Sequence, residues 1–267
     1  TSSQFKIASQ GGASFETRGT RSDLIFGYAT AEPSSPGPPL TGLAILGFRR
    51  LGATGTEVGV LSPSLIEVGR MFVEVTSAVN SVISIVNPSN QDATVDFFFT
   101  DESGVQTHFA TVTVGAHTHF SRFVGDQPLL IDSSGTLNFT SSIPVAAAGF
   151  RTVTNESGEF LISPTPIANP LVVSNEPVVI PDFSDGAAWN SEVVLVNTTE
   201  NEMHGEVRFI SQGSAAEPGT PIEVGIGDGS TSTSVLEYNI PPRSDQRFVT
   251  AGNATRSDFP FSAKGGF

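Results

Sequence analysis

Residues 79–101 read VNSVISIVNPSNQDATVDFFFTD, and residues 189–211 read WNSEVVLVNTTENEMHGEVRFIS. Both stretches contain two short runs of β-branched and aromatic residues bounded by Asn, Gly, Pro or Ser, which is the pattern of strands. Asn87 and Asn197 follow the first run at the same position, where an Asn side chain can close a turn on its own backbone. Each stretch therefore predicts a β-hairpin, and the two hairpins are copies of one repeat.

The similarity continues beyond these hairpins. VTVGAHTHFSRF (residues 112–123) corresponds to YNIPPRSDQRF (238–248), and each predicts a strand, a tight turn and a second strand. A second repeat relates AILGFR (44–49) to AAAGFR (146–151), and a turn and a closing strand follow each copy. The AAAGF segment follows a proline and is too short for an isolated helix, so it is predicted to be a buried strand with small side chains.

The two kinds of half occur in a permuted order. Residues 69–170 contain both halves and predict one complete immunoglobulin-like β-sandwich, whereas residues 1–68 hold only the second half and residues 171–267 only the first. We expect an all-β fold with two such sandwich domains, one contiguous and one split between the N- and C-terminal segments. The length of 267 residues suits two domains of about 100 to 130 residues each.

Half a sandwich exposes an apolar face and an unpaired edge, which is costly in water and can pair with another chain. We expect residues 1–68 to complete residues 171–267, either within one subunit or in the next one. The second arrangement gives a head-to-tail homopolymer, whose partners are copies of the chain itself.

A further match favours exchange between subunits. Residues 2–9 and 20–29 (SSQFKIAS and TRSDLIFGYA) resemble residues 244–251 and 255–263 (SDQRFVTA and TRSDFPFSA). Two copies cannot occupy one position in a closed sandwich, so one strand is left over. The predicted polymerisation interface consists of complementing strands, with Phe5, Ile7, Leu24, Phe26, Tyr28, Val193, Leu195, Val207, Phe209, Phe259, Phe261 and Phe267 as its residues.

The composition limits the partners. A net charge of −14 and a pI near 4.5 argue against nucleic acid, whose phosphates need a cationic surface. No apolar run reaches the roughly 18 to 20 residues of a membrane helix, so no membrane insertion is expected. Cysteine is absent, which leaves no disulfide framework and no thiolate chemistry.

Four motifs carry a resemblance to a known kind of repeat. They are PDFSDGAAWNSEVVLVN (residues 181–197), YNIPPRSDQRFVTAG (238–252), LTGLAILGFR (40–49) and GFRTVTNESGEFLISPTP (149–166). Together they resemble the immunoglobulin-like repeats of long secreted bacterial proteins, although this chain begins and ends in the middle of a domain. The resemblance implies an extracellular or cell-surface location and a structural or adhesive role, and it offers no catalytic residues to carry over.

No motif points to catalysis. The chain has no GxSxG and no HExxH, so we expect neither an enzyme nor a cofactor. His117 and His119 stand at i and i+2, and on a strand they would face one side, where two imidazoles can bind a metal. A solvated strand edge is the simpler interpretation, because no Cys and no suitably spaced carboxylate accompanies them, and no metal is predicted.

Glycans are the remaining candidate partners. The sequons at Asn138, Asn155, Asn197 and Asn253 are candidate glycosylation sites. Trp189 could stack on a carbohydrate, but its counterpart in the other repeat is Val79, and apolar residues at both positions favour packing in a core.

The leading functional prediction is a structural subunit of an extracellular filament or surface layer, assembled head-to-tail by strand or half-domain complementation. The alternative is a cell-surface adhesin module that binds carbohydrate or protein through loops at the ends of the sandwich.

Overall fold

The structure is a computed structural model that describes residues 4–17, 19, 22–34, 40–50, 53–174, 176–186 and 189–252. The chain divides into two compact parts, residues 1–30 and 31–267. The described residues form strands, turns and irregular segments without any helix, so the predicted all-β class is confirmed. Across these residues, therefore, no helix is long and apolar enough to cross a membrane.

The first part, residues 1–30, has no strand among its described residues. The rings of Phe5 and Phe15 meet edge to face, with centroids 5.3 Å apart. Further along, Leu24 is 78% exposed and Phe26 is 75% exposed. This segment thus carries large apolar side chains that it does not bury.

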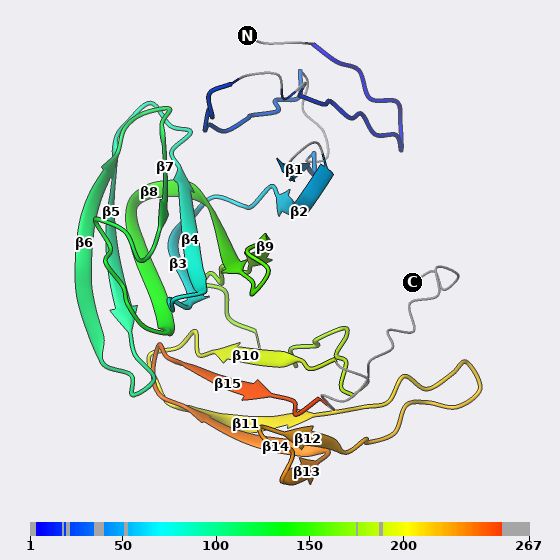
Figure 1. The fold of residues 1–267 in the computed structure, drawn as a ribbon. Helices are drawn as coiled ribbons and strands as arrows, with labels where there is room; N and C mark the ends of the chain where they lie inside the picture. Colours follow the sequence, from blue (N-terminus) through cyan, green and yellow to red (C-terminus); the bar gives the residue numbers. More distant parts are fainter. Residues whose placement is uncertain are drawn as a thin grey trace. The chain divides into compact units, whose positions relative to one another are not determined.

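Seven consecutive strands form the region that contains the main core, named here the seven-strand module (residues 66–169), shown from cyan to light green in Figure 1. The strands are β3 (Ile66–Val73), β4 (Val79–Val86), β5 (Ala93–Thr100), β6 (Gln106–Val114), β7 (His119–Phe123), β8 (Gly135–Thr154) and β9 (Phe160–Thr165). All pairings between them are antiparallel.

Strand β8 belongs to both layers of this module. Its first part pairs with β3 and β5, so that Phe139 lies opposite Phe97, and its second part pairs with β4 and β9, so that Ala147 lies opposite Ile85. Pro144 stands between the two parts, where the pairing of β8 with β3 has an irregularity between Ile66 and Val68, and prolines in sheets are tolerated at such bulges. One long strand therefore joins two four-stranded layers.

Both layers contribute to a single core. Along β4 and β5 apolar side chains alternate between buried and less buried positions, as expected where one face of a strand is covered. The most deeply buried large side chains of the module are Met71, Val73, Ile83, Ile85, Val95, Phe97, Val114, Leu129, Ile131, Leu137 and Phe139. Burying each one stabilises the fold by about 1.5 to 3 kcal/mol before the entropic cost is counted.

The strands predicted from runs of β-branched and aromatic residues are present. Residues 81–86, 94–99 and 110–114 lie within β4, β5 and β6, and the AAAGF segment lies within β8 as a strand. The boundary predicted between residues 68 and 69 falls inside β3. The wider division of the chain into one whole and one split domain stays a prediction.

A second set of strands follows, named here the partial module (residues 176–252). It contains β10 (Glu192–Val196), β11 (Met203–Arg208), β12 (Val224–Ile226), β13 (Thr231–Thr233), β14 (Val235–Ile240) and β15 (Asp245–Val249). They form three separate two-stranded sheets, β10 with β15, β11 with β14, and β12 with β13 (Figure 1).

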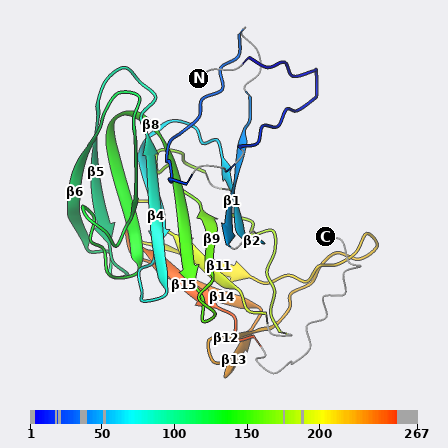
Figure 2. The same ribbon diagram turned by 45° about the horizontal axis from the view of Figure 1, so that its top comes forward.

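The remaining strands, β1 (Leu43–Arg50) and β2 (Ala53–Leu61), form a two-stranded hairpin (Figure 2). Its apolar side chains are largely in solvent: Ile45 is 66% exposed, and Leu43, Leu46, Phe48 and Leu61 are each at least half exposed. The hairpin contacts β9 through the rings of Phe48 and Phe160, whose centroids are 6.2 Å apart.

Candidate interaction surface

The turn after β4 is held by one buried side chain. Nδ2 of Asn87 donates to the carbonyl oxygens of Gln91 (2.7 Å), Val114 (2.9 Å) and Gly115 (3.1 Å), and its Oδ1 accepts a hydrogen bond from the Ser89 amide (3.0 Å). Asn87 has no exposed surface. The side chain thus connects the β4–β5 turn to the end of β6.

The turn after β10 is held in the same way. Nδ2 of Asn197 donates to the carbonyl oxygens of Asn201 (2.7 Å), Ile240 (3.0 Å) and Pro241 (2.9 Å), and Oδ1 accepts from the Thr199 amide (2.8 Å). This asparagine is also fully buried. The predicted equivalence of the two asparagines is confirmed, and with it the equivalence of the strands on either side.

The turn before β7 also has a counterpart, the turn before β15. His117 and Arg243 occupy the same place in these two turns, and both have left-handed backbone conformations, with φ of 56° and 62°. The prediction that His117 and His119 share a strand face is wrong, because His117 lies in the turn before β7 and its Nε2 is 2.7 Å from Oδ1 of Asn90. No group of three metal-ligating side chains is present in the described ranges.

The equivalence extends back to β3. Oγ of Ser81 accepts a hydrogen bond from the Glu74 amide (2.9 Å), and Oγ of Ser191 accepts one from the Ser184 amide (2.8 Å). Ser184 therefore stands where Glu74 stands, and residues 176–184 take the place of β3. The partial module corresponds to the β3–β7 portion of the seven-strand module.

No counterpart of β8 is present in the described partial module. Strand β4 lies between β7 and β8, and β5 lies between β6 and β8. Their counterparts β10 and β11 pair only with β15 and β14, with no second neighbour among the described residues. Among the described residues, one edge of each strand is therefore open, and an open edge presents unpaired N–H and C=O groups that can accept another strand.

The residues beside these edges are less buried than their counterparts. Ile85 and Phe97 have no exposed surface, whereas Leu195 and Val207, in the same positions, are half-buried. Residues 177–183 have no strand partner, so Val178 and Val179 are 85% and 80% exposed. In the seven-strand module the equivalent residues of β3 pair with β8. The absence of one strand accounts for all of these exposures.

The residues predicted for the polymerisation interface fall into three groups. Phe5, Ile7, Leu24, Phe26 and Tyr28 belong to the first 30 residues, where Leu24 and Phe26 are the most exposed of the five. Val193 and Phe209 are buried in the partial module, and Leu195 and Val207 line its half-covered face. Phe259, Phe261 and Phe267 lie outside the described residues. The exposed apolar residues of β1, such as Ile45, were not predicted, although the repeat match to AAAGFR was an available signal.

The sequons differ in accessibility. Asn138 and Asn197 are buried, and Nδ2 of each donates hydrogen bonds within the fold. A glycan on either nitrogen would displace these bonds, which argues against both sites. Asn155 is partly exposed, with Nδ2 2.7 Å from Glu159, and remains a candidate. Asn253 lies outside the described residues.

Arg70 of β3 links the two modules, a role that its sequence context did not indicate. Its guanidinium donates to Oδ1 of Asn138 within the seven-strand module and to the carbonyl oxygens of Asn197 (2.9 Å) and Thr199 (3.4 Å) in the partial module. Glu200 lies 3.4 Å away as an ion partner. Burial lowers the pKa of the Arg70 guanidinium from its ordinary value.

Two further contacts join the modules. Oγ1 of Thr136 donates to the Arg243 carbonyl (2.6 Å), and Oγ of Ser244 donates to the Asp101 carbonyl (2.6 Å). The turn of the partial module thus packs against the end of the seven-strand module at which β8 begins. The carboxyl of Asp245 is buried here, and desolvation, reinforced by Glu102, raises its pKa to about 7.

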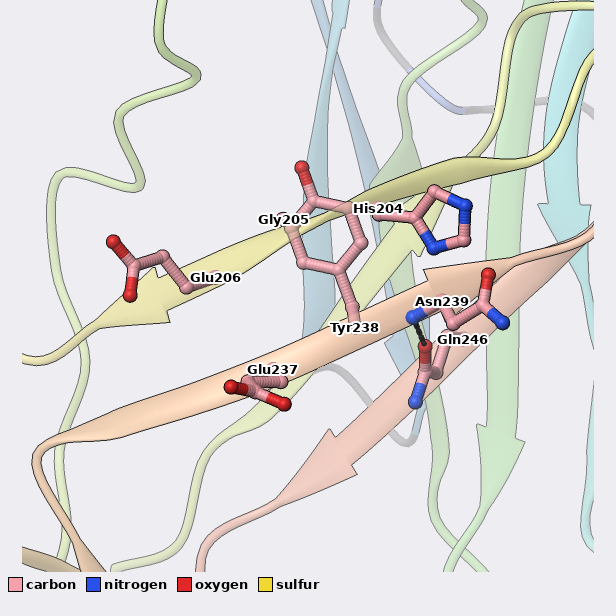
Figure 3. A pocket seen from close by; sticks show the side chains of 7 residues that line it. All are labelled: His204, Gly205, Glu206, Glu237, Tyr238, Asn239 and Gln246. Atoms are coloured by element: carbon pink, nitrogen blue, oxygen red, sulfur yellow. Dashed lines mark hydrogen bonds between the residues drawn. The ribbon is translucent and has the colours of Figure 1, made fainter.

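A surface hollow lies over β11, β14 and β15 (Figure 3). The ring of Tyr238 covers Gly205, where a Cβ atom would collide with it, and the Asn239 amide donates to Oε1 of Gln246 (3.0 Å). Glu206 and Glu237 lie directly opposite each other across the two strands. The hollow is open and acidic, and its lining contains no nucleophile paired with a base.

Trp189 is 47% exposed, so it is not a core residue of the described partial module. Its counterpart Val79 pairs with Val153 of β8. The missing strand again explains the difference.

Comparisons with known proteins do not assign a family. No protein-family model matches the chain, and no curated protein does. A solved structure titled Thermotoga maritima 1070 aligns over 36% of this chain and 91% of its own, at 10% identity and a TM-score of 0.30. The PBSX exported protein XepA aligns over 94% of this chain and 92% of its own, at 13% identity and a TM-score of 0.25.

Proposed function

We propose that the chain is a non-enzymatic structural subunit of an extracellular filament or surface layer. In this proposal the seven-strand module is an immunoglobulin-like sandwich, and the partial module is a sandwich that lacks strands. The N-terminal segment of another copy supplies those strands, so that copies join head-to-tail.

One observation carries the proposal: β10 and β11 have the turns, registers and buried asparagine of β4 and β5, but in the part of the chain that the structure describes they have no second neighbour. Segments that resemble the missing strand are exposed elsewhere in the same chain. Ala44–Arg49 matches the second part of β8, and Leu24 and Phe26 repeat the spacing of Leu137 and Phe139 in its first part. The acceptor and the donor are thus both present.

The energetics favour association. Leu24, Phe26, Leu43, Ile45 and Phe48 each leave at least half of their surface in water. Burying one such side chain contributes about 1.5 to 3 kcal/mol, and new main-chain hydrogen bonds along two strand edges add specificity. The gain competes with an association cost of roughly 4 to 15 kcal/mol, so assembly depends on concentration.

The composition supports the proposed location and partners. A surface rich in Ser and Thr, without cysteine and with a net charge of −14, suits an exported chain that binds copies of itself through strand edges rather than nucleic acid or lipid. No resident cofactor is needed for this role.

Electron microscopy with light scattering over a concentration series tests the proposal. We expect filaments or layers that grow with concentration, and we expect Ile45→Glu to abolish them, because a charge would then enter the completed core. Val105→Glu is the matched control, since Val105 is 60% exposed on the seven-strand module. A chain that stays monomeric at all concentrations would overturn the proposal and favour the adhesin module.

A further inference from the structure

The geometry points to one pairing: β1 of a second copy adds to the open edge of β10 with Ile45 opposite Leu195 and Leu46 opposite Val194. The choice of a second copy rests on the proposed function, whereas the pairing and its register rest on the internal repeat. The donor and the acceptor are therefore both named at the level of single residues.

The register follows from β8. In the seven-strand module Ile85 pairs with Ala147, and Ser84 pairs with Ala148. The equivalence of Asn87 and Asn197 places Leu195 at the position of Ile85. The match of AILGFR to AAAGFR places Ile45 at the position of Ala147. Transferring both gives the proposed pairs.

A glycine in β1 supports this placement. A Cβ atom on Gly149 of β8 would lie 2.7 Å from Cε of Met71 and 2.9 Å from the Thr165 carbonyl oxygen, so the glycine is required there. Its counterpart is Gly47, where a Cβ atom would meet nothing closer than Glu57 at 3.6 Å. Glycine weakens a strand, and the present surroundings of β1 give no reason for it. A close approach in the docked position gives that reason.

Side-chain volumes also complement each other. The inward position held by Phe97 in β5 is held by the smaller Val207 in β11. On the donor side, the inward Ala147 of β8 becomes the larger Ile45 of β1. Volume lost on the acceptor is restored by the donor, as close packing of a shared core requires.

The hairpin is held away from β10 in its own chain. It contacts β9, through Phe48 and Phe160, and residues 62–65 connect it to β3. Four residues span at most about 14 Å, so the hairpin stays near the start of β3, which pairs with β8. Because the hairpin of the same chain lies against β9, we assign the β10 edge to β1 of a second copy.

Engineered disulfides test the register, because the chain contains no cysteine that could compete. The variants I45C/L195C and L46C/V194C place cysteines at neighbouring cross-strand pairs, one of which is a non-hydrogen-bonded pair with a short Cα separation. The variant I45C/V194C is the control, because its two side chains would lie on opposite faces. Under mild oxidation we expect a ladder of linked chains from at least one matched pair and about tenfold less from the control.

Mixing the single variants I45C and L195C tests whether the strand comes from a second copy, separately from the register of the pairing. A linked heterodimer supports pairing between copies. A disulfide within one chain of a double variant would overturn the second-copy assignment and the filament, but not the register. Assembly without any cross-link in either matched pair would overturn the register itself and indicate that another segment fills the edge.

Gly47→Ala gives an independent readout. The hairpin alone tolerates the methyl group, whereas the docked position does not, so we expect the concentration needed for assembly to rise about tenfold or more. Gly42→Ala, just before β1, adds the same methyl group and should leave assembly unchanged. Equal assembly of both variants would contradict the close approach.

Discussion

Asn87 and Asn197 donate to equivalent carbonyl groups at two turns 110 positions apart. Each side chain satisfies four backbone groups, so the turn depends on this one amide. The two asparagines also define how the modules superpose, and only that superposition shows that the described residues of the partial module contain no β8 counterpart.

Replacing either asparagine should destabilise its own module. Asn87→Ala removes a donor from the Val114 carbonyl group and the acceptor of the Ser89 amide, whereas the carbonyl groups of Gln91 and Gly115 keep donors from Ser89 and Thr118. We expect a loss of about 2 to 3 kcal/mol in the free energy of unfolding. Urea denaturation measures it. Asn90→Ala, at an exposed position of the same turn, should cost less than about 0.5 kcal/mol. Equal stability of the two variants would show that the buried amide is dispensable.

Removing Arg70 should weaken the contact between the modules. Arg70→Met removes the donor to the Asn197 carbonyl oxygen and to Oδ1 of Asn138, whereas the Thr199 carbonyl oxygen keeps the Arg243 amide as a donor. We expect a loss of about 2 to 4 kcal/mol in the free energy of unfolding. The control is Glu200→Gln, because Glu200 is largely in solvent and an exposed ion pair contributes little, about 0 to 1 kcal/mol. An Arg70→Met protein with unchanged stability would contradict the linking role.

Asp245 should make stability depend on pH. Its pKa is raised to about 7 in the folded chain and is about 3.9 in an unfolded one, so the folded state binds the extra proton between these values. Stability therefore falls as pH rises from about 4 to about 7, and the penalty is fully present above that range.

The isosteric variant Asp245→Asn isolates this effect. Between pH 5 and pH 8 the wild type should lose on the order of 2 kcal/mol more than the variant, measured by urea denaturation at both pH values. Parallel pH profiles of the two proteins would be the contrary result.

Gly149 should be irreplaceable within β8. A methyl group there would push into Met71 and the Thr165 carbonyl, and we expect Gly149→Ala to cost about 1 to 3 kcal/mol through overpacking, measured as a shift in the urea midpoint. Gly47→Ala, at the equivalent position of β1, is the matched variant and should leave the urea midpoint unchanged in dilute solution. A similar loss in both proteins would refute the difference in packing.

The sequence predicted the strands where short runs of β-branched and aromatic residues are bounded by turn residues, as in residues 81–86. It also predicted that Asn87 and Asn197 occupy equivalent positions in two copies of one repeat. The double role of β8 was not predictable, because Ser141, Ser142 and Pro144 interrupt its apolar pattern at the crossing between layers. Arg70 gave no signal either, since its partners are backbone carbonyl groups, which any sequence could supply.

The most direct test of the central claim, that β10 has an open edge that another copy fills, is hydrogen exchange of residues 189–197 in dilute and in concentrated solution. We expect fast exchange of the edge amides in dilute solution and strong protection after assembly, with β4 protected under both conditions. Protection of β10 that is already complete in the monomer would contradict the claim, because the edge would then be filled within one chain.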